Sequence, residues 1–316
     1  MQHTILRPVS STELELDADH KLGVHSGAEV PITLFPAPAG TGIEFVRTDK
    51  EIEGRNPVIP ARFENVADTA LCTQIVNKDG VGISTIEHLM AAVAAAGIDN
   101  LRIHVGGPEL PIMDGSSIRF LEMLDRAGVE AQGQPRKAIK IIKPVEVTLG
   151  DKIVRLTPAS RQIFSAEIDF NDGFIGHQHF EMVLNEANFR EHLAAARTFG
   201  YVEDVEMMQA AGKALGARPT NAIAISRQDR EVISPEGLRY TGREEFVRHK
   251  MLDAVGDLAL WGQPIIGAYY GYKAGHDMHA RLLRELAARP DAWTEVYLGQ
   301  VPVWTPAKKQ LERLPA

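Results

Sequence analysis

The sequence is poor in cysteine, and Cys72 is the only one among 316 residues. A disulfide framework and a metal cluster built from thiolates are therefore excluded, and a single thiol fits a reducing compartment. Long apolar runs are missing as well. The longest, around residues 89–96, is far too short to cross a bilayer, and residues 1–11 have no apolar core of the kind that a signal peptide needs. We expect a cytoplasmic protein without stable membrane insertion.

Basic residues are in the minority, with 34 Lys and Arg against 42 Asp and Glu and a formal net charge of -8. A nucleic-acid-binding protein usually presents a basic face, so we expect no nucleic-acid partner. An anionic small substrate is compatible with this balance, because a few local Lys and Arg side chains can outweigh a weak overall field. Hydrophobic residues make up 44% of the chain. That share and length suffice for two compact domains, each with its own core.

The two halves of the chain show similar patterns of strands and helices. In the first half we expect strands at 30–35, 42–46 and 101–105 and helices at 85–96 and 117–126. A polar stretch with Gly and Pro, residues 131–137, is typical of a linker. In the second half, β-rich segments at 138–148, 153–157, 164–170 and 179–183 precede helices at 187–196, 204–211, 246–261 and 276–288. The predicted fold class is α+β, with similar domains over residues 1–130 and 131–316.

The strongest chemical pattern lies in the predicted helix at 246–261, where His249 and Asp253 stand four residues apart. On a helix this spacing places both side chains on one face, so an imidazole and a carboxylate can reach one metal ion. Asp257 lies one turn further along that face and can orient another group. The same spacing is also typical of an amphipathic surface helix with solvated polar residues.

A second pattern, Ser84-Thr-Ile-Glu87-His88, opens an apolar helix. Ser84 and Glu87 have the spacing of a capping box, and Gly97 stands where a helix commonly ends. Glu87 can therefore be only a cap, and His88 only a partly buried core residue. Together with the pair on the later helix, however, His88 completes the two-histidine, one-carboxylate set of catalytic zinc sites. A free Glu beside such a ligand is the usual general base.

His276 follows a glycine-flanked turn at 271–275 and has two interpretations. It can act as a general acid, kept protonated by Asp257, or it can simply open the next helix. The sequence has no H-E-x-x-H pattern, which excludes the helix of a standard zinc peptidase.

Several motifs stand in the order found in one enzyme family: Thr85-Ile-Glu-His88, Gly97-Ile-Asp-Asn100, Pro111-Ile-Met-Asp-Gly115, Ala196-Arg-Thr-Phe-Gly200 and Phe246-Val-Arg-His-Lys250. Through these motifs, and from Gly23-Val-His-Ser-Gly27 to His276, the chain resembles the UDP-3-O-acyl-N-acetylglucosamine deacetylases of lipid A biosynthesis. The resemblance implies a zinc-dependent amidohydrolase that releases acetate from the N-acetyl group of UDP-3-O-acyl-N-acetylglucosamine. We expect the enzyme to act as a monomer.

The resemblance also implies a role for individual side chains. It makes His88, His249 and Asp253 the Zn2+ ligands, Glu87 the general base, and His276 the cationic group that stabilises the oxyanion and protonates the leaving amine. It makes Asp257 the partner of His276, Thr198 a hydroxyl donor to the oxyanion, and Lys250 a substrate-binding ammonium beside the metal. Phe199 is implied to lie near the sugar, and Phe170, Lys152 and Lys273 to contact uracil and diphosphate.

The family's fold consists of two βααβ layers packed helix to helix, with the zinc at the junction and a small insert in each domain. The second insert, here near residues 199–226, forms a passage for the fatty acyl chain. This stretch is rich in apolar residues, namely Val202, Val205, Met207, Met208, Leu215, Ala222, Ile223 and Ile225. They can line such a passage, or they can seat a helix and a strand on the domain.

Two segments depart from the family's pattern. Asp172-Gly173 replaces a usual His-Pro, in the region of the nucleotide pocket, and residues 217–221 replace a glycine-serine run near the acyl passage. Two other functions compete with the family's activity. One is a zinc amidohydrolase acting on another acetylated sugar, which would need no acyl passage. The other is an inactive acyl-sugar binder with structural zinc, which an intact Glu87 and an open coordination position disfavour.

Overall fold

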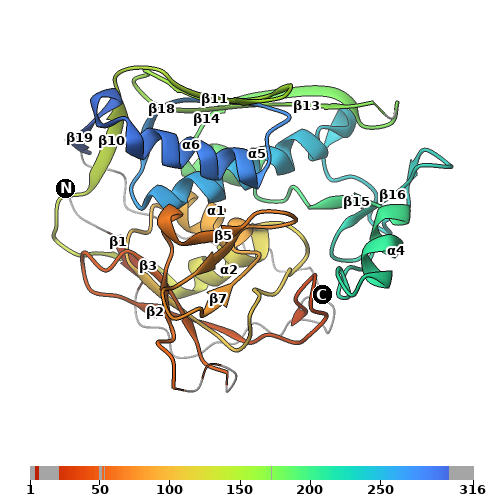
Figure 1. Cartoon of the computed structure of the whole chain (residues 1–316), viewed down its shortest axis with the longest axis horizontal. Helices are drawn as coiled ribbons and strands as arrows, with labels where there is room; N and C mark the ends of the chain where they lie inside the picture. The colour runs from red at the N-terminus through yellow and green to blue at the C-terminus, as the bar shows by residue number, and fades with distance from the viewer. Residues whose placement is uncertain (1–3, 7–20, 50–51, 53, 172, 299–316) are drawn as a thin grey trace, which may run out of the picture.

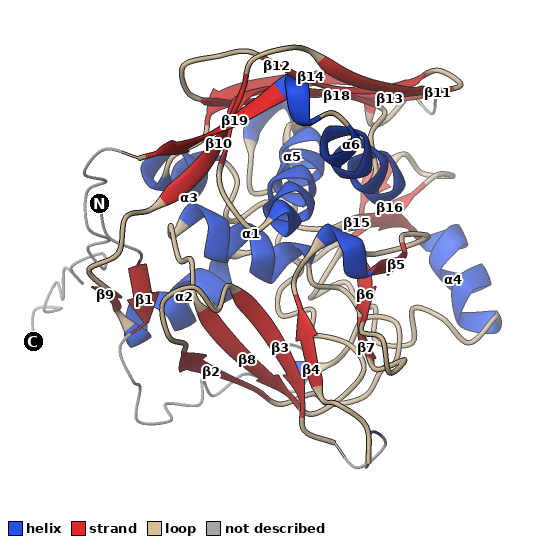
Figure 2. Ribbon diagram, turned by 60° about the vertical axis from the view of Figure 1, so that its left-hand side comes forward, coloured by secondary structure: helices blue, strands red, loops and turns tan. Residues whose placement is uncertain are grey.

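The computed structural model describes residues 4–6, 21–49, 52, 54–171 and 173–298 and shows a layered α+β molecule (Figure 1). Two β-sheets form opposite outer faces, and helices from both halves of the chain lie between them (Figures 1 and 2). This is the α+β class predicted from the sequence. In the described part of the chain, no helix combines the length and the apolar composition needed to span a membrane.

The sheet of the first half has the strand order β2-β8-β3-β4. Its members are β2 (Ile32–Pro36), β3 (Ile43–Arg47), β4 (Val58–Pro60) and β8 (Leu101–Val105). Along β8, Leu101, Ile103 and Val105 are buried while Arg102 is exposed, because successive side chains of a strand point to opposite faces. The buried face is covered by α1 (Glu87–Ala95) and α2 (Ile118–Ala127) (Figure 2). A small sheet of β5 (Val66–Asp68), β6 (Gln74–Val76) and β7 (Gly82–Ile83) stands beside them.

The sheet of the second half contains seven strands: β10 (Lys137–Ile141), β11 (Val145–Leu149), β12 (Lys152–Thr157), β13 (Gln162–Phe170), β14 (Gly176–Val183), β18 (Ile265–Tyr272) and β19 (Trp293–Tyr297). β18 is central, since it pairs with β10, β12 and β13. α5 (Glu245–Leu258) and α6 (His276–Ala288) cover the inner face, and α3 (Glu186–His192) follows β14 (Figure 2).

The core helices α1 and α5 meet between the two sheets. Every residue of α1 from Glu87 to Val93 is buried, as expected for a helix that is apolar nearly all round. Gly256 on α5 faces the backbone of Glu87 so closely that an added Cβ would overlap the Glu87 carbonyl. The absence of a side chain at 256 therefore sets how near the two helices can come.

The helix ends follow local chemistry. α1 ends in a Schellman motif, where Gly97 has φ +67° and the amide of Ile98 donates to the carbonyl of Val93. α6 covers the predicted residues 276–288, and the predicted helix at 246–261 is α5 continued by a short 3-10 turn, η5 (Ala259–Trp261). The helix expected at 187–196 ends earlier, at His192, because Leu193 leaves the helical conformation. The carbonyl of Ala196 accepts a hydrogen bond from His249 Nδ1 instead of from a helical amide.

Several short strands and 3-10 turns had no clear signal in the sequence, whereas the helix expected at 204–211 is present as α4 (Val202–Ala210). At the edge of the molecule, β15 (Phe199–Tyr201), α4, β16 (Ile223–Ser226) and β17 (Glu231–Val232) form a separate unit (Figure 1). β1 (Thr4–Leu6) pairs with β9 (Val129–Ala131). Further 3-10 turns are η3 (Phe63–Asn65), η4 (Thr241–Arg243) and η6 (Pro290–Ala292). The expected domain boundary at 130/131 falls at the end of β9.

Candidate active site

Three potential metal ligands meet where α1 and α5 cross. His88 lies in the first turn of α1, and His249 and Asp253 lie one turn apart on α5. Their ligand atoms are all within 4.8 Å of one another. The Nε2 atoms of His88 and His249 are 3.6 and 3.4 Å from the same oxygen, Asp253 Oδ1. All three residues are buried, so these polar groups do not form a solvated helix face.

The donor set fits a divalent zinc ion. Asp253 Oδ1 is buried without a hydrogen-bond partner, although its other oxygen accepts from the Lys250 ammonium at 2.6 Å. A buried carboxylate oxygen is normally satisfied, so this one is suited to binding a cation. His249 Nδ1 donates to the Ala196 carbonyl at 3.1 Å, which leaves the Nε2 lone pair free. Two imidazole nitrogens and one carboxylate oxygen are a common protein contribution to catalytic zinc sites.

The charge states of these groups suit metal binding. Burial lowers the pKa of His249 to about 3, which keeps its imidazole neutral at ordinary pH. Burial alone would raise the pKa of Asp253, but the neighbouring His249 and Lys250 hold it well below its usual range. A neutral imidazole and an ionised carboxylate are the forms that bind metal.

Glu87, the residue before His88, lies between this group and His276. Its Oε1 is 3.8 Å from His276 Nε2, and its Oε2 accepts from the Thr73 amide at 3.1 Å. Burial raises the pKa of Glu87. The capping-box alternative is wrong, because the Ser84 hydroxyl donates to the Pro108 carbonyl and no side-chain cap bond is made at the start of α1.

His276 is the first residue of α6, and its ring also lies beside the carboxylates of Asp257 and Glu87. Its Nδ1 lies 2.8 Å from Asp257 Oδ2, the contact expected from the sequence. Burial disfavours the imidazolium, yet the carboxylates of Asp257 and Glu87 outweigh it and raise the pKa of His276 to about 9. Burial opposes ionisation of Asp257 too, but His276 holds its pKa well below the usual range. The pair is therefore a carboxylate and an imidazolium at neutral pH.

Thr198 belongs to the segment that passes over α5 beside His249. The preceding Arg197 is buried and pairs with Glu245 at 2.8 Å, which anchors the segment at the start of α5. The Thr198 amide donates to the Gly115 carbonyl at 2.8 Å. The motifs at 111–115 and 196–200 therefore meet at this point.

Of the four residues expected to contact substrate, the two aromatic ones lie close together. The Phe199 ring is 6.2 Å from the His249 ring and 5.9 Å from the Phe170 ring, between centroids. Lys273 follows β18, and its ammonium contacts Asp151 at 2.9 Å and Asp169 at 3.2 Å. Lys152 opens β12 at the same end of the sheet and is exposed.

Sequence reasoning missed three residues that surround Asp257. The Thr73 hydroxyl donates to Asp257 Oδ1 at 2.6 Å, and His279 Nδ1 lies 2.7 Å from Asp257 Oδ2. Tyr269 Oη is 2.8 Å from His279 Nε2. Thr73 and Tyr269 gave no signal, but His279 stands three residues after His276 on one helix face, a spacing visible in the sequence.

The loop at 22–27 is held by a buried carboxylate. Glu109 accepts from the amides of His25 and Ser26, both at 2.9 Å, and from the Thr85 hydroxyl at 3.1 Å. A Cβ at Gly23 would overlap the Glu109 carboxylate, which accounts for the first glycine of the motif at 23–27.

Comparison with known proteins decides the family. The LpxC family model, UDP-3-O-acyl N-acetylglycosamine deacetylase, matches residues 13–288. A UDP-3-O-acyl-N-acetylglucosamine deacetylase of Phenylobacterium zucineum (strain HLK1) is 46% identical, over 92% of this chain and 95% of the relative. Proteins of the same name from Myxococcus xanthus (strain DK1622) and Actinobacillus pleuropneumoniae serotype 3 (strain JL03) are 43% and 44% identical. These matches cover 91% and 86% of this chain and 90% and 88% of the relatives, respectively.

The chain belongs to this deacetylase family. Two segments depart from the family pattern. Asp172 is outside the described residues. Residues 217–221 form a loop that Asn221 closes, since its side chain accepts from the Arg218 amide at 2.8 Å and donates to the Gly216 carbonyl at 3.0 Å.

The stretch at 199–226 combines buried and exposed apolar residues. Ile223 and Ile225 are fully buried and seat β16. In contrast, α4 has no buried residue, and Met207 and Leu215 are 64% and 42% exposed. The core account therefore holds for Ile223 and Ile225, whereas the apolar side chains of α4 are half-buried or exposed.

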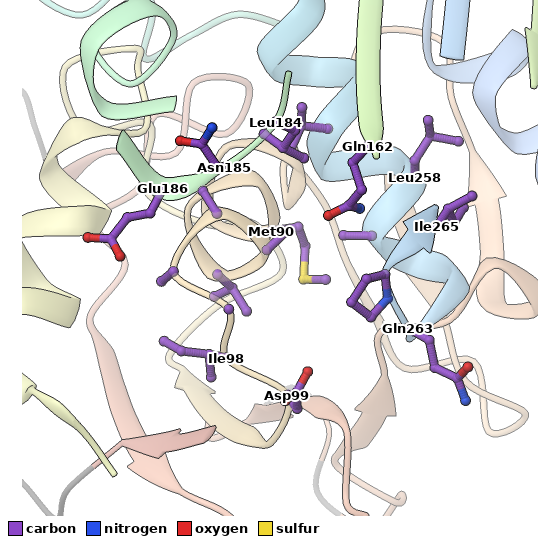
Figure 3. Close-up of a pocket in the computed structure, with 18 of the residues that line it drawn as sticks. Met90, Ile98, Asp99, Gln162, Leu184, Asn185, Glu186, Leu258, Gln263 and Ile265 are labelled. Carbon is purple, nitrogen blue, oxygen red and sulfur yellow. The ribbon is translucent and has the colours of Figure 1, made fainter. Parts of the chain in front are cut away.

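A cavity of about 750 Å³ lies on another side of the α1–α5 contact (Figure 3). Its lining includes Met90 from α1, Leu258 from α5 and Leu184 after β14, and the Met90 side chain projects into it. The possible metal ligands, Glu87 and His276 do not line it. This deacetylase-family chain thus has an apolar cavity distinct from the polar site.

Proposed function

We propose that the chain hydrolyses the N-acetyl group of UDP-3-O-(3-hydroxyacyl)-N-acetylglucosamine, releasing acetate and the free amine. The observation that carries this proposal is the position of Glu87 and His276. Their side chains face each other at 3.8 Å, directly beside the buried group of two imidazoles and one carboxylate. A base and an acid beside a metal-binding group are what amide hydrolysis requires.

We propose zinc as the ion, held by His88, His249 and Asp253. When bound, zinc supplies Lewis acidity and makes a water molecule acidic enough to attack near neutral pH. The unpartnered Asp253 Oδ1 and the neutral His249 support this assignment. Lys250 donates to the other oxygen of Asp253 and keeps that carboxylate oriented.

The proton transfers fall to Glu87 and His276. Glu87 accepts a proton from the attacking water as the new C–O bond forms, and its raised pKa brings it closer to that of an effective base. His276 begins protonated, with Nδ1 held by Asp257 and Nε2 facing the site. Its Nε2 proton passes to the amide nitrogen as the C–N bond breaks, so the amine leaves in neutral form. The Thr198 hydroxyl donates a hydrogen bond to the acetyl oxygen, where negative charge develops.

The remaining residues bind the substrate. Phe199 contacts the sugar from its place beside the His249 ring, and Phe170 lies next to it. Lys273 and Lys152 stand at one end of the sheet and supply positive charge to the diphosphate. The unit at 199–226, within the proposed C-terminal domain, receives the acyl chain along α4, whose apolar side chains are half-buried or exposed.

The activity is tested with the purified protein and UDP-3-O-acyl-N-acetylglucosamine, measuring acetate release. Chelation should abolish turnover, and one equivalent of zinc should restore it. Glu87→Gln should retain bound zinc but lose activity by at least about 100-fold. Turnover that persists in metal-free protein would contradict the zinc proposal.

A ladder of substrates with 3-O-acyl chains of increasing length tests the substrate class. On the proposed function kcat/KM rises with chain length and then levels, since each buried methylene contributes about 0.8 kcal/mol. Val205→Trp on α4 should shorten the optimum chain without changing zinc content. Ile223→Trp is unsuitable because Ile223 is a core residue. An equal rate for the unacylated sugar would favour an amidohydrolase for simpler acetylated sugars.

A further inference from the structure

The carboxylate of Asp257 is surrounded by more donors than an acid–base pair requires. Its Oδ1 accepts from the Thr73 hydroxyl at 2.6 Å. Its Oδ2 faces two imidazole nitrogens, Nδ1 of His276 at 2.8 Å and Nδ1 of His279 at 2.7 Å. Only His276 also faces Glu87, and His279 reaches the site through Asp257 and through an edge contact with the His276 ring, 6.5 Å between centroids.

The direction of each hydrogen bond follows from Asp257. An ionised carboxylate only accepts, so the ring proton of His279 is on Nδ1. In the neutral ring Nε2 is then an acceptor, and the Tyr269 hydroxyl donates to it at 2.8 Å. Burial raises the pKa of Tyr269 well above its usual value, so the hydroxyl keeps its proton. The result is a chain of hydrogen bonds in which Tyr269 donates to His279 and His279 donates to Asp257.

The place of these hydrogen bonds in the fold allows them to constrain His276. His276 is the first residue of α6, and His279 lies one turn further inside on the same face. His279 is fully buried, and Tyr269 comes from the central strand β18 and is only 2% exposed. Two rigid elements thus fix the orientation of Asp257, whereas His276 stands at a helix end with a partly accessible ring.

We propose that His279, held by Tyr269, is a positioning residue that fixes the Asp257 carboxylate so that it aligns and restrains the His276 imidazolium. This inference rests on the proposed function. Without the His279 donor, Oδ2 keeps only His276 as a partner, so apart from the Thr73 bond to Oδ1 the carboxylate is held by the same imidazole that it should align. The misaligned imidazolium then delivers its proton less often to the amide nitrogen. Because substrate binding does not depend on that alignment, the loss falls on kcat rather than KM.

The test compares two amides at position 279. In His279→Asn the amide nitrogen lies near the place of Nδ1 and can still donate to Asp257. In His279→Gln the amide reaches toward Tyr269 and away from the carboxylate, although glutamine is closer to histidine in size. We expect His279→Asn to stay within about threefold of wild-type kcat and His279→Gln to lose about 10- to 100-fold, both with KM nearly unchanged.

A pH profile separates positioning from mere space filling. Removing a donor from Oδ2 leaves more negative charge facing His276, so the basic limb of kcat/KM should move to higher pH in His279→Gln and stay in place in His279→Asn. The other charged groups around the pair, Glu87, Asp253 and Lys250, are the same in both variants. Ring NMR of His276 should report the same shift without turnover.

Matched controls lie on the same sheet. Tyr270 is the next residue on β18 and points to the opposite face, where it donates to Glu167, so Tyr270→Phe should leave kcat unchanged. His177 is an exposed histidine paired with the same Glu167, and His177→Asn serves as the histidine control. Tyr269→Phe should reduce kcat less than His279→Gln does.

Equal losses in the two amide variants, or a greater loss in His279→Asn, would overturn the proposal and leave His279 as a packing residue. Thermal unfolding of each variant identifies a loss that comes from instability. If His279→Gln does not fold, Tyr269→Phe provides the test. A wild-type kcat and an unshifted basic limb of kcat/KM in that variant would contradict the proposal, and a lowered kcat would support it. Wild-type protein that releases no acetate would refute the proposed function instead, and the NMR shift would still test the geometry.

Discussion

Gly256 allows a stringent test of how the two halves of the chain build one site. In Gly256→Ala the new Cβ would lie 2.8 Å from the carbonyl carbon of Glu87 and 3.1 Å from its Cα, and closer still to the carbonyl oxygen. Ordinary van der Waals contact begins at 3.4 Å. Backbone atoms cannot rotate away, so α1 must move from α5 by roughly an ångström or more in this densely packed interior.

Two opposing effects set the size of the change in stability. At an open helical position, Gly to Ala stabilises a protein by about 1 kcal/mol. Overpacking a close contact costs about 1–3 kcal/mol. We therefore expect the free energy of unfolding to fall by up to about 2 kcal/mol, whereas helix propensity alone would raise it. Activity should suffer more, because the displaced residues are Glu87 and the adjacent His88. A misplacement of about 1 Å can cost about 100-fold, so a fall in kcat of at least about 10-fold is expected.

Urea unfolding and acetate release, measured at saturating zinc, check both expectations. Ala287→Gly is the matched control, since Ala287 is exposed on α6 and the change reports only the Gly–Ala difference in helix propensity. That variant should lose no more than about 1 kcal/mol, because Ala287 lies in the last turn of α6, and it should keep its kcat. If Gly256→Ala proves more stable than the wild type and equally active, the close approach of α1 and α5 does not set the geometry of the site.

Two further predictions follow from buried charges. The rate should fall as pH rises through about 9, because His276 is proposed to act protonated. Burial lowers the pKa of His276, but Asp257 and Glu87 raise it more, to about 9. His276→Gln should therefore remove this basic limb from the kcat/KM profile. Arg197→Met should lower the free energy of unfolding by about 3–5 kcal/mol in urea titrations, because it leaves the Glu245 carboxylate buried without its counter-charge, held only by backbone amides. An exposed pair makes the control, and Arg227→Met should cost no more than about 1 kcal/mol.

Elements whose pattern repeats within a few residues could be predicted closely from the sequence. The strand at 101–105 and the helix at 276–288 match the structure at both ends. The i,i+4 spacing of His249 and Asp253 predicted a shared helix face, and their ligand atoms do meet. Short strands such as β5 and β16 carry too few residues for a period to show.

The capping box failed for a tertiary reason. Ser84 and Glu87 have the required spacing, but Thr85 between them takes φ +59°, so Ser84 stays outside the helix. The Glu87 carboxylate turns instead to the Thr73 amide, which belongs to another segment. A local hydrogen bond was available, and a longer-range one replaced it.

Thr73 shows why the orientation of the site could not be predicted from spacing. Its amide donates to Glu87 and its hydroxyl donates to Asp257, a residue 184 positions later in the chain. No local pattern reports such a contact, because it exists only after the two halves have packed together. The proposed base and the partner of the proposed acid are therefore tied to one another through a single threonine at the α1–α5 junction. Since Gly256 sets the approach of the same two helices, any change that separates them should disturb the proposed base and acid together, before the protein unfolds.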